Sequence, residues 1–194
     1  MFNAKTKTMR WICLLFMSLL LSGGLFAQDQ KTIKETRKEA SQRKKEEKKA
    51  KIENQYKITD SLLEERKFVL EAQFLKTSRG ERFPVISTLN FIFVDSLSGV
   101  IQVGSVQRVG YNGVGGVTVQ GRISNWKLEK DEKQKNFYLI FSIQGNIDIY
   151  DVNMNIDYAG YAYATLNGIN SGKLTFEGNL VSKEETVIFK GQTW

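Results

Sequence analysis

Carboxylates are the side chains of this sequence best suited to acid–base chemistry, because its 194 residues include no His and one Cys. Without His the chain has no Ser-His-Asp or Cys-His catalytic set and no His-ligated zinc, copper or iron site. Asp95, Asp148 and Glu177 lie in a β-patterned region. A glycosidase-type pair must stand about 5–9 Å apart across a cleft, which strand alternation alone does not provide. We therefore expect no enzyme, and a carboxylate-dependent hydrolase is the least favoured alternative.

Two motifs have the composition of ion or phosphate sites but depart from the required pattern. An EF-hand loop needs Gly at its sixth position and an acid at its twelfth, whereas this motif has Ile156 and Ala162 there. The glycine-rich segment Gly110–Gly116 (GYNGVGG) lacks the Lys of a phosphate loop and precedes a β pattern. We predict no metal and no cofactor, and a polar strand face for the first motif, whose residues are Asp151, Asn153, Asn155 and Asp157.

Aromatic residues near predicted strand ends are the candidates for binding. Tyr161 and Tyr163 share one face of a strand, opposite Ala162 and Ala164. Such a face could stack on sugar rings or contact a partner protein, and ordinary cross-strand packing is the alternative. The complete candidate set is Trp126, Tyr150, Tyr161 and Tyr163.

A cupped sheet that carries a small apolar ligand is the second functional hypothesis. It requires that Phe91, Phe137 and Phe141 line a hollow, and a filled interior at these residues would exclude it. The first and favoured hypothesis is that the protein is a non-enzymatic binding module for a protein or glycan partner.

Residues 1–27 have the pattern of a signal peptide. Three basic residues precede the uncharged, mostly apolar run from Trp11 to Phe26, and Ala27 is a small residue before Gln28. We predict cleavage between Ala27 and Gln28, with an uncleaved anchor as the alternative. The mature chain would contain no Cys, and no later run is long enough to span a bilayer. Export to the periplasm or cell envelope follows.

Residues 28–67 form a charged segment with 13 Lys and Arg against 9 Asp and Glu. Residues 30–57 contain no Gly or Pro and consist mostly of helix formers, which predicts a helical leader. Glu46 and Glu47 interrupt its basic run, so a solubilising role is favoured, and contact with an anionic surface is the alternative. We expect no nucleic-acid binding, because no aromatic residue interleaves the basic cluster, whose residues are Arg43, Lys44, Lys45, Lys48 and Lys49.

From Phe68 onward apolar residues alternate with a period of two, which is typical of strands. Short turn signals separate the strands and no helical pattern intervenes. The phase changes at Tyr150–Asp151, which predicts a turn or bulge there. We predict a mainly β fold: an antiparallel meander, as a sandwich or half-barrel, over residues 68–181 after the charged helix. Residues 182–194 would form a tail or an edge strand.

Three segments of this β region carry a resemblance to a known family. Val85–Asp95 (VISTLNFIFVD), Gly110–Gly121 (GYNGVGGVTVQG) and Lys173–Gly178 (KLTFEG) resemble an exported Bacteroidetes family catalogued as domain of unknown function 4251. The resemblance covers about residues 68–181. It implies export, an antiparallel β fold and a Gram-negative envelope setting, and it implies no activity.

Overall fold

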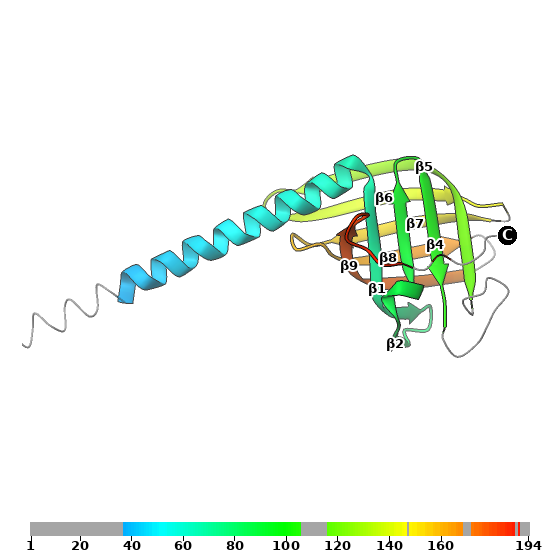
Figure 1. Ribbon diagram of the computed structural model, residues 1–194, viewed down its shortest axis with the longest axis horizontal. Helices are drawn as coiled ribbons and strands as arrows, with labels where there is room; N and C mark the ends of the chain where they lie inside the picture. Colours follow the sequence, from blue (N-terminus) through cyan, green and yellow to red (C-terminus); the bar gives the residue numbers. More distant parts are fainter. Residues whose placement is uncertain (1–36, 106–115, 147, 169–171, 189, 191–194) are drawn as a thin grey trace, which may run out of the picture. The chain divides into compact units, whose positions relative to one another are not determined.

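The computed structural model describes residues 37–105, 116–146, 148–168, 172–188 and 190 (Figure 1). The predicted signal peptide with its cleavage position at Ala27 and Gln28 lies outside these ranges, as do residues 110–115 of the glycine-rich segment. The chain divides into two units, Met1–Ala50 and Lys51–Trp194. Within the described residues, no helix has the length and apolar character needed to cross a bilayer.

Residues 37–65 are helical, as the composition of the leader predicts. In the first unit, residues 37–50 are exposed throughout. In the second unit, residues 51–65 bury Tyr56, Thr59 and Leu63. The helix ends at Arg66, which has a positive φ of 54° and donates its backbone N–H to the Leu63 carbonyl. This turn directs the chain into the first strand.

Nine strands follow in the part of the chain that the structure describes, and all their pairings are antiparallel. A short 3₁₀ turn, Ser87–Leu89, interrupts the meander between the second and third strands. The strands are β1 (Lys67–Thr77), β2 (Arg82–Pro84), β3 (Phe91–Asp95), β4 (Ser98–Val103), β5 (Val117–Asp131), β6 (Asn136–Gln144), β7 (Ile149–Ile156), β8 (Tyr161–Gly168) and β9 (Gly172–Ser182).

The sheet closes on itself because β1 pairs with both β3 and β9. The result is an eight-stranded antiparallel barrel, with β2 as one extra strand beside β1 (Figure 1). The antiparallel β fold behind a helix is therefore confirmed, and the meander forms a closed barrel in place of a sandwich or half-barrel. Closure requires Gly178, because a Cβ at this position would overlap the carbonyl oxygen of Glu71 on β1.

One end of the barrel is filled by apolar side chains and by helical residues 51–65. Phe137 and Phe141 are fully buried, and Tyr56 of the helix stacks on Phe137 with ring centroids 4.7 Å apart. Leu63 belongs to the same cluster. Burial of these side chains supplies most of the free energy that holds the helix against the strands.

An ion-pair cluster also joins this helix to β5. The Lys130 ammonium lies 2.5 Å from an Asp60 carboxylate oxygen and 2.6 Å from one of Glu64. The hydrogen bond to Asp60, and then that to Glu64, raises the pKa of Lys130 well above its ordinary value. The folded protein therefore favours the charged form of Lys130.

The described part of the C-terminal segment covers the outer face of β1, β3 and β4. Ile188 packs against a second cluster, formed by Val69, Phe91 and Val100. Lys183 forms an ion pair of 2.6 Å with Asp95. Residues 183–188 contain no strand.

Two sequence predictions are corrected by this arrangement. The change of strand phase lies between the end of β6 at Gln144 and the start of β7 at Ile149, just before the predicted position. Ile149, the first residue of β7, consequently lies on the outer face and is 39% exposed. Phe91 does not line a shared interior with Phe137 and Phe141, because it belongs to the outer cluster beneath Ile188.

Candidate functional site

An apolar hollow lies at the barrel end opposite helical residues 51–65. Its volume is about 270 Å³. The two-residue spacing of the lining positions on β4, β5 and β9 matches the inner face of each strand. Of the lining residues, Tyr150 alone carries a polar side-chain group. The barrel-end hollow is lined by Ile101, Val103, Val117, Val119, Tyr150, Leu166, Gly172 and Leu174.

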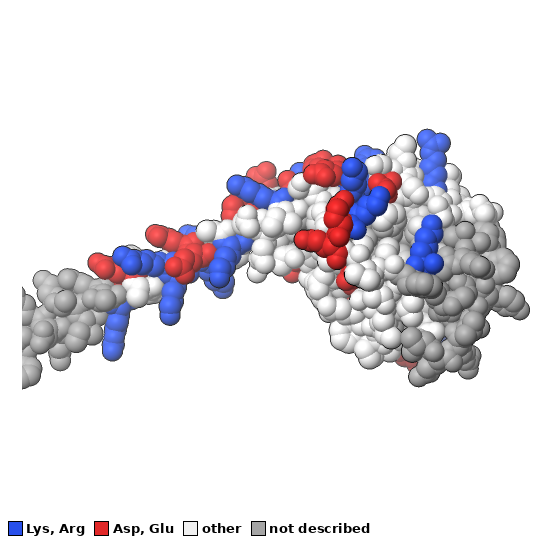
Figure 2. All heavy atoms as spheres, viewed as in Figure 1, with Lys and Arg blue, Asp and Glu red and all other residues white. Residues whose placement is uncertain are grey.

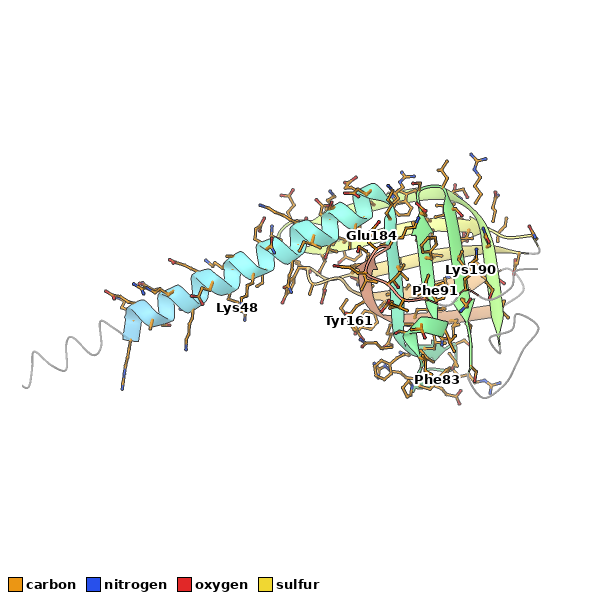
Figure 3. The ribbon with its side chains drawn as sticks, in the orientation of Figure 1. Lys48, Phe83, Phe91, Tyr161, Glu184 and Lys190 are labelled. Carbon is orange, nitrogen blue, oxygen red and sulfur yellow. The ribbon has the colours of Figure 1, made fainter. Side chains whose placement is uncertain are left out.

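A second recess of about 440 Å³ adjoins the barrel-end hollow, since Val103 and Leu174 line both. Its other walls come from β1, β2 and the 3₁₀ turn. Two of its apolar side chains are unusually exposed, Phe83 at 41% and Ile86 at 48%, and Phe83 projects beside β2 in Figure 3. Exposed apolar side chains around a concave apolar surface are typical of binding sites.

The positions of Phe91, Phe137 and Phe141 test the carrier hypothesis, which requires that these residues line a hollow. Phe137 and Phe141 are packed in the main core and Phe91 in the outer cluster, each with 0% exposure. These three residues do not line a hollow, so that version of the hypothesis is wrong. The space available for a ligand lies at the other end of the barrel.

The four candidate aromatics occupy three separate places. Tyr150 lines the barrel-end hollow. Trp126 is half-buried near Phe141, with ring centroids 5.3 Å apart, and the Arg66 guanidinium covers its ring. Tyr161 and Tyr163 lie together on the outer face of β8. The structure therefore brings together only the last two.

The outer face around Tyr161 and Tyr163 also contains an ion pair. The two tyrosine rings meet edge to face at 5.4 Å, and Tyr163 is 49% exposed. Glu177 is buried and accepts a 2.6 Å hydrogen bond from Arg82. This bond raises the pKa of Arg82 above its ordinary value, with a smaller contribution from Tyr161. We call this group, with Phe74 beneath Arg82, the tyrosine face.

The three candidate catalytic carboxylates are on different elements. Asp95 ends β3 and pairs with Lys183. Asp148 precedes β7, at the opposite end of the barrel, and accepts the Ile149 backbone N–H. Glu177 lies on the outer face of β9. Asp95 and Asp148 thus cannot face one substrate.

The acidic and amide motif of residues 151–157 is a polar strand face followed by a turn. Val152, Met154 and Ile156 alternate with it and are buried. Asp151 accepts a hydrogen bond from Ser142, and Asp157 accepts the backbone N–H groups of Ala159 and Tyr161. Among the residues that the structure describes, no group of three or more His, Cys, Asp or Glu could hold a metal ion.

Sequence reasoning did not identify most of the barrel-end hollow. Nothing in the sequence shows that the strand face that carries Val117 and Val119 meets Leu166 and Leu174. The useful signal is that all four residues share the inward phase near one end of their strands. It becomes readable only once the pairing of the strands is known.

The structure is a closed antiparallel barrel with helical residues 51–65 at one end and a small apolar hollow at the other. A model of the domain of unknown function DUF4251 matches residues 32–180, so the chain belongs to the DUF4251 family. The crystal structure of a DUF4251 family protein from Bacteroides eggerthii is similar. The two chains share 34% identity with a TM-score of 0.59, over 72% of this chain and 95% of that one. No curated protein matches the sequence.

Proposed function

We propose that this protein is an exported, non-enzymatic binding module of a Gram-negative cell envelope, and that its ligand is a small apolar molecule held in the barrel-end hollow. The observation that carries the proposal is the hollow itself, walled by β4, β5, β7, β8 and β9. The signal-peptide pattern and the Bacteroides relative support the envelope setting.

The volume of the hollow limits the ligand. Its volume of about 270 Å³ has room for a compact ligand or for several waters. Water in such a space finds few polar partners, whereas each buried CH₂ of a ligand contributes about 0.8 kcal/mol. A compact molecule or a short acyl or alkyl chain fits best, with Tyr150 as the one lining residue that carries a polar side-chain group. A longer chain would extend into the adjoining recess past Leu174.

Isothermal titration calorimetry with straight-chain alcohols from hexanol to dodecanol tests this site. We expect affinity to rise about fourfold per added CH₂ until the chain outgrows the hollow. Leu174→Trp places an indole in the hollow and should abolish binding. Its matched control is Lys173→Trp, an exposed neighbour on the opposite face of β9, which should bind normally. Equal binding by the two variants, or no binding by the wild type, would refute the proposal.

The tyrosine face supports a second candidate function, contact with a glycan or protein partner. Its favouring observation is the exposed Tyr163 ring beside the charged Arg82–Glu177 pair. Tyr163→Ala should weaken capture of envelope oligosaccharides at least tenfold, since aromatic stacking contributes about 1.4 kcal/mol. Tyr138→Ala, which removes a 40% exposed tyrosine from β6, is the control and should have no effect.

A further inference from the structure

In helical residues 37–50, all but one of the basic side chains lie on one side of the helix, and the acidic side chains lie outside that side. At 3.6 residues per turn, the six basic residues of one side span about 140° of the helix circumference. The three acidic residues of this segment, Glu39, Glu46 and Glu47, all lie outside that arc, as does Arg43. Figure 2 shows Lys and Arg side chains projecting from the lower side of the helix. We call this side the basic face: Arg37, Lys38, Lys44, Lys45, Lys48 and Lys49.

Helical geometry separates the acidic residues within the basic run from the basic face. In the sequence Glu46 and Glu47 interrupt the lysines, but on a helix both lie outside the arc of the basic face, whereas Lys44 and Lys48 lie one turn apart within it. Five of the six residues that line one shallow recess on this segment are Arg37, Ser41, Lys44, Lys45 and Lys48. Lys48 is marked in Figure 3. The basic side chains therefore present one continuous positive surface.

We propose that the basic face docks on a bilayer that contains anionic lipid headgroups. The positive surface runs along the helix and is wide enough to contact a plane. Residues 37–50 contain no aromatic side chain, so the segment lacks the stacking groups of a single-stranded nucleic-acid site. It also lacks a large apolar face, so contact is electrostatic, remains at the headgroups and weakens with salt. This inference is independent of the barrel-end hollow.

The test compares two variants that lose the same charge, one from the basic face and one from residues outside it. Lys44→Gln with Lys48→Gln removes two charges from the basic face. Arg43→Gln with Lys57→Gln removes two from elsewhere on the helical segment, where Lys57 is an exposed residue of the second unit. Each protein, isolated from its host's envelope, is sedimented with vesicles of phosphatidylcholine alone or with phosphatidylglycerol added. Circular dichroism verifies equal helix content.

We expect wild-type protein to prefer the anionic vesicles and to lose that preference in high salt. At about fivefold per basic residue, the Lys44 and Lys48 double variant should bind them about 25-fold more weakly. The Arg43 and Lys57 variant should change by less than about threefold. Equal losses in both variants, or equal binding of wild type to neutral vesicles, would overturn the proposal. If the wild type self-associates and the Lys44 and Lys48 double variant does not, the basic face contacts a second copy of the chain. That result would also overturn the proposal.

Discussion

Replacing Leu63 tests whether the helix is part of the barrel core. Leu63 is fully buried among core residues of the barrel. Leu63→Ala removes three carbons, worth about 2 kcal/mol at ~0.8 kcal/mol per methylene-sized group. The cavity left behind adds about 1 kcal/mol where neighbours do not collapse. We expect the free energy of unfolding to fall by about 3 kcal/mol.

Urea denaturation followed by tryptophan fluorescence measures this loss, because Trp126 packs beside Phe68 and Phe141. With a slope of about 2 kcal/mol per molar urea, the midpoint should fall by about 1.5 M. Leu62→Ala is the control: Leu62 is only half-buried and should lose about 1 kcal/mol. Equal shifts for the two variants would show that the helix does not depend on Leu63, and would refute the packing described above.

Three further changes are expected to alter stability in defined ways. Gly178→Ala should destabilise by at least about 2 kcal/mol in urea, because its Cβ meets the Glu71 carbonyl; an unchanged midpoint contradicts this. Since folding raises the pKa of Lys130, its stabilisation is complete below pH 10.5 and is lost as pH rises above that value. Lys130→Met should therefore flatten the fall of the urea midpoint in alkali, and a parallel fall contradicts this. Ile188→Ala should cost about 1–2 kcal/mol by thermal melting, whereas Val187→Ala, at a 79% exposed position, should cost under about 0.5 kcal/mol; equal losses contradict the packing of Ile188.

Local patterns were sufficient to predict most individual strands. Period-two alternation predicted strands from Phe68 onward, and the structure confirms them. On β3, Phe91 faces the outer cluster whereas Ile92 and Val94 face the main core, so this strand is covered on both sides. These signals are readable because each depends on residues close together in sequence.

Closure of the barrel was not predictable in the same way. It depends on the pairing of β1 with β9, which joins Phe68 to Ser182 across the length of the domain. Alternation gives the faces of these strands but not their partners. The barrel-end hollow depends on the same pairing, so its residues other than Tyr150 were also missed. The segregated charges of residues 37–50 were hidden for a simpler reason, since they appear only when the residues are placed around a helix.

Native mass spectrometry of protein isolated from its host's envelope tests the barrel-end ligand site most directly. Wild type and Lys173→Trp should each retain a small noncovalent adduct, and Leu174→Trp should be free of it. Collisional release of the adduct would give the mass of the apolar ligand. A bare wild-type protein, or the same adduct on Leu174→Trp, would contradict ligand binding in the hollow.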